Sequence, residues 1–96
     1  MLTRTDILTK LQFAKPSLEK KYNVRAMALF GSYSRNDATE ESDVDILVDF
    51  EKAIGIQFVD LADELEILLH HKVDLVSARA IKPKYLNAIK SDLIYV

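Results

Sequence analysis

The run LFGSYSRNDATEESDVDILVDF, residues 29–50, decides how this chain folds. Its first residues complete a mostly apolar stretch, VRAMALF (24–30), which is typical of a buried strand that runs into a tight turn at Gly31. The polar turn formers of NDATEES (36–42) predict a loop. VDILVDF (44–50) is rich in β-branched and aromatic residues and predicts a second strand. The run therefore predicts two strands joined by a glycine turn and a loop.

The sequence on either side of this run predicts helices. Residues 5–22 carry apolar side chains at helical spacing, and Pro16 within them predicts a kink or two short abutting helices. Residues 56–69 predict a second long helix, and residues 32–35 are long enough for one helical turn. The predicted apolar side of the second long helix consists of Phe58, Val59, Ala62, Leu65, Ile67, Leu68 and Leu69. Its predicted solvated side consists of Asp60, Asp63, Glu64 and Glu66.

The remainder of the chain completes an alternating order of elements. A third strand is predicted at 73–77, a short helix at 83–90 and a final edge strand at 93–96. Alternating helices and strands predict an α/β (α+β) fold in which helices flank a small mixed β-sheet, although the sequence leaves open which strands run parallel. The length of 96 residues, without linker or repeat, predicts a single domain over residues 1–96.

Composition and charge exclude several classes of function. Thirteen basic and fifteen acidic side chains give a net charge of −2, which is too little to hold free nucleic acid strongly. Cysteine is absent, so that disulfides, zinc–thiolate sites and thiol catalysis are excluded. The polar N-terminus does not have the pattern of a signal peptide or membrane span. We therefore expect a cytoplasmic protein that does not bind membranes.

Two carboxylates stand at the start of the second predicted strand. Because side chains alternate along a strand, Asp43 and Asp45 face one side while Val44 and Ile46 enter the core. At a separation of roughly 5 Å and an effective dielectric near 20, two such charges repel by about 3 kcal/mol. No lysine or arginine lies close by in sequence, and hard divalent cations prefer carboxylate oxygens. Magnesium is the cation that best satisfies this pair.

Three further features extend this pattern. Asp74 would join the same face if its strand lies beside 44–50, and three carboxylates can hold the two metal ions used in phosphoryl or nucleotidyl transfer. Gly31 lets the backbone approach a phosphate closely, and the amides and hydroxyl of Ser32 can donate to its oxygens. Arg35 can add a charge-assisted contact to the phosphate.

Each of these features also has a purely structural interpretation. A Gly-Ser after a strand is usually a turn, and an Asp-x-Asp is usually a solvated strand end. His70 and His71 are interpreted as a polar turn between helix and strand, without a partner at metal-ligand spacing. Tyr33 is expected to pack, with a role in lining a nucleotide pocket as the alternative. The joint occurrence of glycine turn, paired aspartates and a third strand carboxylate outweighs these structural interpretations.

The spacing of Gly31-Ser32, ten residues and Asp43-Val44-Asp45 resembles the G-S-x10-D-x-D signature of the DNA polymerase β-like nucleotidyltransferase superfamily. The chain is similar over nearly its whole length to the minimal nucleotidyltransferases, including the MntA-type antitoxins of HEPN/MNT toxin–antitoxin pairs. The resemblance implies that Gly31 and Ser32 hold the triphosphate of ATP, and that Asp43, Asp45 and Asp74 bind two Mg²⁺ ions and carry catalysis. Asn36 stands where many members have glycine, and asparagine tolerates the same positive φ.

The resemblance also implies a function and a partner. The expected activity is transfer of AMP from ATP to a hydroxyl, expected to be a tyrosine hydroxyl, of a HEPN-type ribonuclease toxin with which the chain forms a hetero-oligomer. The alternative is an antitoxin that neutralises its toxin by binding alone, since a chain of 96 residues has little room to recognise an acceptor by itself. Transfer to a small molecule ranks last, because it usually requires an added domain.

Overall fold

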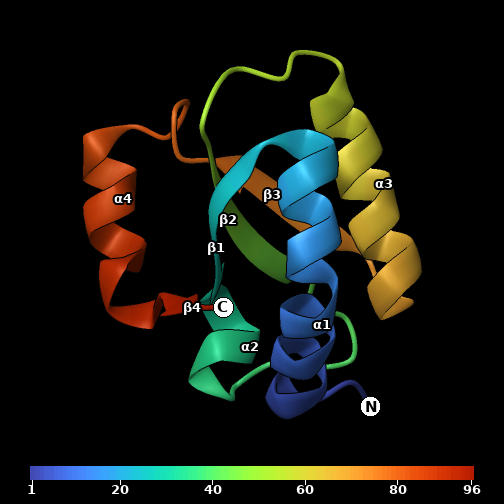
Figure 1. Cartoon of the computed structure of the whole chain (residues 1–96). Coiled ribbons are helices and arrows are strands. Elements are labelled where there is room, and N and C mark those ends of the chain that lie inside the picture. The colour runs from blue at the N-terminus through green and yellow to red at the C-terminus, as the bar shows by residue number, and fades with distance from the viewer.

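The structure, a computed structural model, describes residues 1–96 and combines helices with one four-stranded sheet (Figure 1). The elements in chain order are α1 (Arg4–Tyr22), β1 (Val24–Phe30), α2 (Gly31–Arg35), β2 (Val44–Phe50), α3 (Gln57–Leu69), β3 (Val73–Ser77), α4 (Pro83–Ile89), a 3₁₀ turn (Lys90–Asp92) and β4 (Ile94–Tyr95). The predicted strands at 24–30, 44–50 and 73–77 are confirmed with the same bounds.

The sheet is mixed, with the strand order β3-β2-β1-β4. β1 is antiparallel to both β2 and β4, whereas β2 and β3 are parallel. A parallel pair needs a crossover connection, and α3 supplies it between β2 and β3. This confirms the predicted α/β class with a small mixed sheet, and it answers the question of strand direction that the sequence left open.

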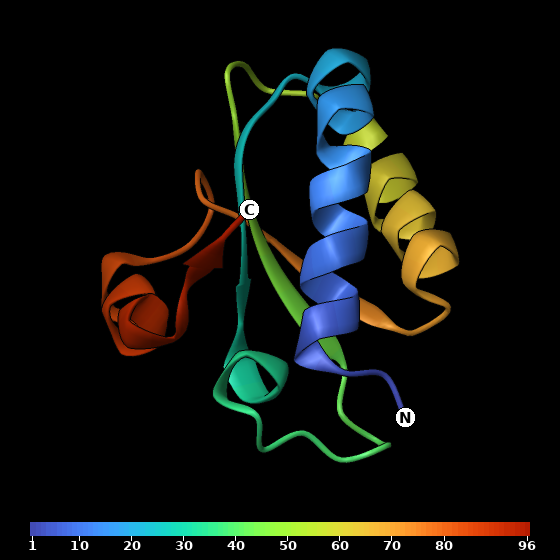
Figure 2. The same cartoon turned by 60° about the horizontal axis from the view of Figure 1, so that its bottom comes forward.

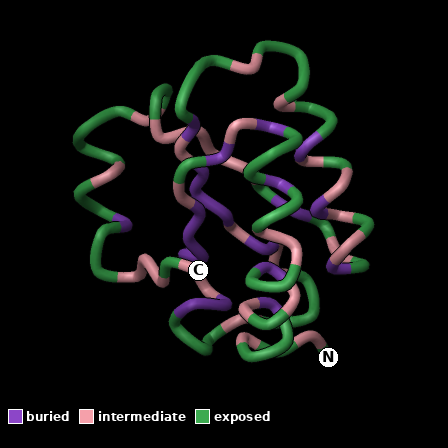
Figure 3. Tube along the Cα trace, in the orientation of Figure 1, coloured by how far each residue is buried: buried purple, intermediate pink, exposed green.

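One face of the sheet is covered by α1 and α3, which lie side by side on it (Figure 2). The main core forms there from alternate strand residues and from the inner faces of the two helices. Its fully buried members include Ile7, Leu11, Met27, Leu29, Val44, Ile46, Val48, Leu61 and Leu65. Figure 3 shows buried stretches along the central strands β1 and β2, whereas burial along the helices alternates with exposed segments.

The opposite face of the sheet is covered in part by α4. Ile89 of this helix packs in a small cluster with Phe30 of β1 and Leu47 of β2. Leu47 follows Asp45 by two residues, and alternation therefore places Asp45 on this second, less covered face. The sheet consequently has one closed face that supplies stability and one more open face that carries the carboxylates.

Pro16 lies inside α1, where a kink or two short abutting helices were expected. The expectation of two helices is wrong, because α1 is one helix from Arg4 to Tyr22. Proline removes one N–H that would donate to the carbonyl four residues earlier. Pro16 and Gln12 are both exposed, so that water can bond to the carbonyl of Gln12. The helix also begins with a capping box, in which Thr3 and Asp6 each accept a backbone N–H of the other.

The predicted apolar side of α3 is wrong at two positions. Val59 and Ile67 are 59% and 72% exposed, whereas Leu61, Leu65 and Leu69 are buried at the four-residue spacing of one helix face. The face that reaches the core is therefore narrower than the predicted set.

The acidic side of α3 is also less solvated than predicted. Glu64 accepts hydrogen bonds from Lys21 at 2.6 Å and from the hydroxyl of Tyr22 at 3.2 Å. Glu66 Oε2 accepts the backbone N–H of Val73 at 3.0 Å and so fixes the start of β3. Of the four acidic residues, only Asp60 and Asp63 are exposed to solvent as expected.

The C-terminal segment closes the sheet. The predicted short helix ends one residue earlier than expected, at Ile89, and continues as the 3₁₀ turn. β4 then pairs with β1 at the edge, which confirms the predicted edge strand. None of the helices combines the length and the apolar character needed to span a membrane.

Candidate active site

Gly31 closes β1 and has a φ of +77°, a conformation that favours glycine. A Cβ at this position would overlap the carboxylate oxygen Oδ2 of Asp45 and come within 3.0 Å of its carboxyl carbon. The turn and the Asp45 side chain therefore share one small space. Only glycine allows both to be present.

The helical turn α2 that follows is held at several points. Asn36, which follows its last residue Arg35, has a φ of +63°, so it adopts the left-handed conformation that was expected of asparagine at this position. The carbonyl of Ser32 accepts the N–H of Asp37 at 3.0 Å. Arg4 donates to the carbonyl of Ser34 at 2.9 Å, and the hydroxyl of Ser34 donates to the carbonyl of Asp92. The Gly31-Ser32 turn is thus a fixed element of the fold.

The three predicted carboxylates are brought to one region of the open face. Asp43 precedes β2 directly, and Asp45 is the second residue of that strand. Val44 and Ile46 are fully buried on the opposite face, as the alternation predicts. Asp45 and Asp74 are partners in the parallel β2–β3 register, so that their side chains leave the sheet beside each other. Asp74 was expected to join the other two aspartates only if its strand lies beside β2. β3 does lie beside β2.

The electrostatics of Asp45 show how close these carboxylates are. Its pKa is raised from 3.8 to about 6, first because burial disfavours the charged form and then because the carboxylates of Asp74 and Asp43 lie nearby. Arg35 acts in the opposite direction, but more weakly. A carboxyl with such a pKa binds a cation readily, because the cation replaces the proton and relieves the repulsion.

No basic side chain pairs with Asp43, Asp45 or Asp74. The four ion pairs of the protein join Lys21 to Glu64, Arg25 to Asp49, and Arg35 to both Asp37 and Asp92. The charge of the three aspartates is therefore not neutralised within the chain. This is the condition that favours a bound divalent cation.

The three aspartates fit a magnesium site in which substrate phosphates supply some of the metal ligands. No three Asp, Glu, His or Cys side chains converge closely enough in this structure to form a closed metal cage. Magnesium, however, is usually held by one or two carboxylates together with water and substrate phosphates. Oxygen ligands on one face beside a glycine turn fit this mode, and a closed cage of protein ligands is not required.

Arg35 lies at the end of α2 and is engaged by other groups. Its Nε donates to Asp37 Oδ2 at 3.1 Å and its terminal nitrogen donates to Asp92 Oδ2 at 2.7 Å. The pKa of Arg35 is raised, first by the hydrogen bond to Asp92 and next by that to Asp37. Asp92 holds the guanidinium at the 3₁₀ turn and Asp37 holds it at the loop after α2, so contact with a phosphate would require Arg35 to exchange one of them.

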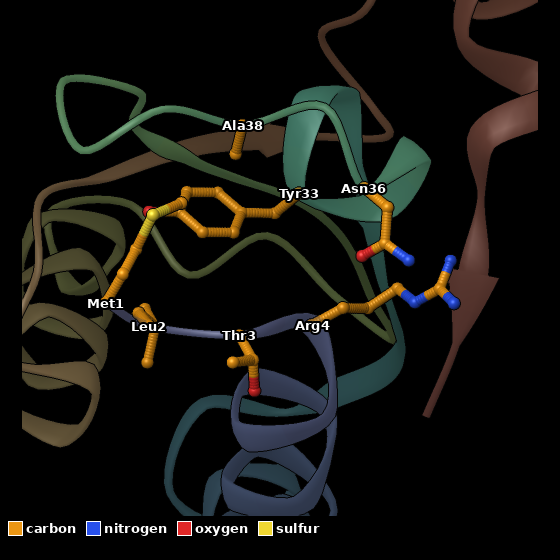
Figure 4. A pocket seen from close by; sticks show the side chains of 7 residues that line it. All are labelled: Met1, Leu2, Thr3, Arg4, Tyr33, Asn36 and Ala38. Atoms are coloured by element: carbon orange, nitrogen blue, oxygen red, sulfur yellow. The ribbon is translucent and has the colours of Figure 1, made fainter.

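A cavity of about 190 Å³ lies behind α2, between the N-terminal segment and the Tyr33 ring (Figure 4). Its lining residues are Met1, Leu2, Thr3, Arg4, Tyr33, Asn36 and Ala38. None of the three aspartates lines this cavity. This cavity is therefore separate from the face of the sheet that carries the three aspartates. Tyr33 is only 3% exposed, in agreement with the packing role expected for it.

The interpretation of His71 as a simple polar turn is incomplete. Its Nε2 lies 3.3 Å from the hydroxyl of Tyr33, and the two rings meet edge to face at 5.7 Å with an angle of 82°. His71 and Tyr33 are 38 residues apart in sequence, and no local pattern joins them. Their contact arises because the fold brings Tyr33 of α2 beside the turn between α3 and β3, and only the folded chain reveals it.

The model of the family described as polymerase beta, nucleotidyltransferase matches residues 12–95. The chain belongs to this family. It is a nucleotidyltransferase, and the superfamily expected from the G-S-x10-D-x-D spacing is confirmed. A Methanocaldococcus jannaschii protein that carries the provisional name protein adenylyltransferase is 48% identical over 98 residues and covers 100% of both chains. The protein adenylyltransferase MntA of Thermococcus cleftensis is 40% identical over 100% of this chain and 98% of its own.

Solved nucleotidyltransferase structures have the same fold. One provisionally described as a minimal nucleotidyltransferase has a TM-score of 0.82 at 30% identity, covering 97% of this chain and 95% of its own. A complex of a tri-AMPylated Shewanella oneidensis HEPN toxin with its MNT antitoxin has a TM-score of 0.66 at 25% identity, over 92% and 68%. A toxin–antitoxin structure with AMP-PNP has a TM-score of 0.60 at 30% identity, over 84% and 61%.

Proposed function

We propose that this nucleotidyltransferase is an antitoxin that transfers AMP from ATP to a hydroxyl of a HEPN-type toxin. The observation that carries the proposal is the arrangement of Asp43, Asp45 and Asp74 without basic partners beside the Gly31-Ser32 turn. A triphosphate bound at that turn would place its phosphates against the carboxylates. The two negative groups can lie together only if cations lie between them.

The three aspartates are the proposed ligands of two Mg²⁺ ions. When bound, these ions would neutralise the phosphate charge, lower the pKa of the acceptor hydroxyl and stabilise the leaving pyrophosphate. Gly31 lets the backbone approach the triphosphate, and the Ser32 amide and hydroxyl donate to its oxygens. Arg35 is a further proposed phosphate ligand once it leaves Asp37 or Asp92.

The reaction is a displacement at the α-phosphorus of ATP. The acceptor oxygen forms a bond to that phosphorus, and the bond from the α-phosphorus to the oxygen bridging to the β-phosphate breaks, releasing pyrophosphate. Asp74 is the proposed acceptor of the hydroxyl proton. It is the one exposed member of the three carboxylates and lies on the edge strand β3, where an incoming acceptor can reach it.

The partner and the nucleotide are supported by the relatives. An MntA protein adenylyltransferase is 40% identical over the whole chain, and similar folds occur in toxin–antitoxin complexes with AMPylated toxin and with AMP-PNP. A tyrosine of the toxin is the proposed acceptor, and a hetero-oligomer of antitoxin and toxin is the proposed assembly. The cytoplasm, which supplies magnesium and ATP, is the proposed place of reaction.

The experiment incubates the protein with Mg²⁺, ATP and its candidate HEPN toxin, and measures the mass of the toxin by mass spectrometry. We expect whole AMP units on the toxin with the wild type and none with the Asp43→Ala/Asp45→Ala variant. Wild-type protein that adds no AMP would contradict the proposal. Because an antitoxin can also act by binding alone, the same variant is tested for protection of cells expressing the toxin. Full protection by the variant would assign neutralisation to binding.

A further inference from the structure

His71 lies where the three segments that carry the candidate site meet. These segments are the turn at Gly31-Ser32, the start of β2 and the start of β3. The imidazole links the glycine turn to the two strands through hydrogen bonds at both ring nitrogens. Nε2 lies 3.3 Å from the hydroxyl of Tyr33, and Nδ1 lies 3.0 Å from the carbonyl oxygen of Lys72. A single side chain thus links the proposed triphosphate turn to the strands that bear the aspartates.

The two hydrogen bonds define the protonation of the neutral ring. The carbonyl of Lys72 can only accept, and therefore Nδ1 of His71 carries the proton. Nε2 is then an acceptor and receives the hydroxyl proton of Tyr33. Tyr33 is 3% exposed, so its hydroxyl would lose its partner without gaining full access to water if His71 were removed.

The carbonyl of Lys72 also accepts the backbone N–H of Val44 at 3.0 Å. Val44 stands between Asp43 and Asp45, and Lys72 precedes Asp74 by two residues. A continuous chain of hydrogen bonds therefore runs from Tyr33 through His71 and Lys72 to Val44. It connects the residue after Ser32 with the backbone that directs all three carboxylates.

We propose that His71 is a positioning residue, which fixes the Gly31-Ser32 turn relative to the three aspartates through Tyr33 and the Lys72 carbonyl. This inference rests on the proposed use of that turn for the triphosphate. Small displacements of groups that orient a substrate can lower rates strongly, because the bound geometry must be close to that of the reaction. Loss of the bridge should therefore weaken nucleotide binding beyond any loss of fold stability.

The competing explanation is that His71 only packs against Tyr33. The edge-to-face contact between the two rings would persist with phenylalanine at position 71, whereas both hydrogen bonds would disappear. His71→Phe therefore separates packing from hydrogen bonding, and Tyr33→Phe removes the same bond from the other side. His70→Asn is the matched control, since His70 is exposed with a φ of +50° that asparagine also adopts.

The experiment measures the Kd for AMP-PNP with Mg²⁺ by calorimetry for the wild type, the three single variants and the Tyr33→Phe/His71→Phe double variant. We expect His71→Phe and Tyr33→Phe each to weaken binding by about 2- to 10-fold, the range expected for one hydrogen bond. The Kd of the double variant should be no higher than that of the single variant with the higher Kd, because both changes break the same bridge. His70→Asn should bind as the wild type does.

The outcomes distinguish this inference from the proposed function, because nucleotide binding requires no acceptor. Wild-type protein that binds AMP-PNP but transfers no AMP contradicts the proposed function and leaves the Kd comparison valid. Unchanged Kd values in both single variants overturn the inference. If His71→Phe fails to fold, Tyr33→Phe and the ¹⁵N NMR shifts of His71 decide. A neutral ring protonated at Nε2 would contradict the proposed bridge, and one protonated at Nδ1 would support it.

Discussion

The carboxylate of Asp45 lies so close to the α-carbon of Gly31 that no side chain fits between them. Asp45 is the register partner of Phe30 on β1 and of Asp74 on β3, and therefore stands between the glycine turn and the third aspartate. The two halves of the sequence signature, glycine turn and paired aspartates, are thus one structural unit. A change in either half should disturb the other.

Gly31→Ala should abolish nucleotide transfer and destabilise the protein. The added Cβ meets both an unfavourable φ of +77° and the Asp45 carboxylate. Gly55→Ala is the matched control, since Gly55 also has a positive φ of +58° but nothing lies within 4 Å of an added Cβ. We expect a loss of about 1 kcal/mol for the control and a larger loss at Gly31, measured by urea denaturation. Equal losses in the two variants would show that the contact with Asp45 is unimportant.

The stability of the metal-free protein should fall as pH rises through the pKa of Asp45. In the folded state this pKa is about 6, above its ordinary value of 3.8, so the folded state holds a proton that the unfolded state releases. Between these values the stabilisation from the protonated form is lost as pH increases. The fall is at most about 3 kcal/mol, and solvent screening at this half-buried site reduces it. Urea denaturation in a chelator at about pH 4.5 and about pH 7.5 measures about two thirds of this fall, and the component should vanish in the Asp45→Asn variant.

Asp45→Asn should make the metal-free protein more stable at neutral pH while removing transferase activity. The amide has no charge to be repelled by Asp43 and Asp74, but it binds a cation poorly. Asp49→Asn is the control on the same strand, because Asp49 forms a partly exposed ion pair with Arg25 that contributes little stability. Thermal unfolding and an AMP-transfer assay measure the two effects. A destabilised Asp45→Asn protein would contradict the electrostatic account.

Arg35 should bind phosphate better once Asp92 no longer holds it. Asp92→Asn removes the charge from the 2.7 Å ion pair and leaves Asp37 as the one charged partner of Arg35, and we therefore expect equal or tighter binding of AMP-PNP. Arg35→Gln should weaken binding by about 2- to 10-fold, the range of one hydrogen bond. If Arg35→Gln leaves the Kd unchanged, Arg35 serves only to fix the 3₁₀ turn.

The sequence predicted the strands of this fold well because their apolar runs are short, bounded by turn formers and buried. The carboxylate side of β2 followed from alternation alone, since Val44 and Ile46 are fully buried. The sequence could not show that β2 and β3 are parallel, nor that Asp45 and Asp74 are register partners. This pairing brings Asp74 beside Asp45. That pairing depends on the α3 crossover and is a property of the packed chain.

The errors of prediction arise where long-range contacts decide. Glu64 and Glu66 looked like solvated residues, but α1 and the start of β3 supply partners for them. His71 looked like a turn residue because Tyr33, its partner, is 38 residues away. Pro16 looked like a helix break, yet its exposed position lets water satisfy the carbonyl of the preceding turn.

The reaction class is tested most directly with two samples of labelled ATP, one labelled on the α-phosphate and one on the γ-phosphate. Each is incubated with the protein, Mg²⁺ and the HEPN toxin, and the label attached to the toxin is measured. Displacement at the α-phosphorus predicts that the α-label becomes covalently attached to the toxin, that the γ-label leaves as pyrophosphate, and that Asp45→Asn attaches neither. Attachment of the γ-label would mean phosphoryl transfer and would contradict the account, as would equal α-label with wild-type protein and Asp45→Asn.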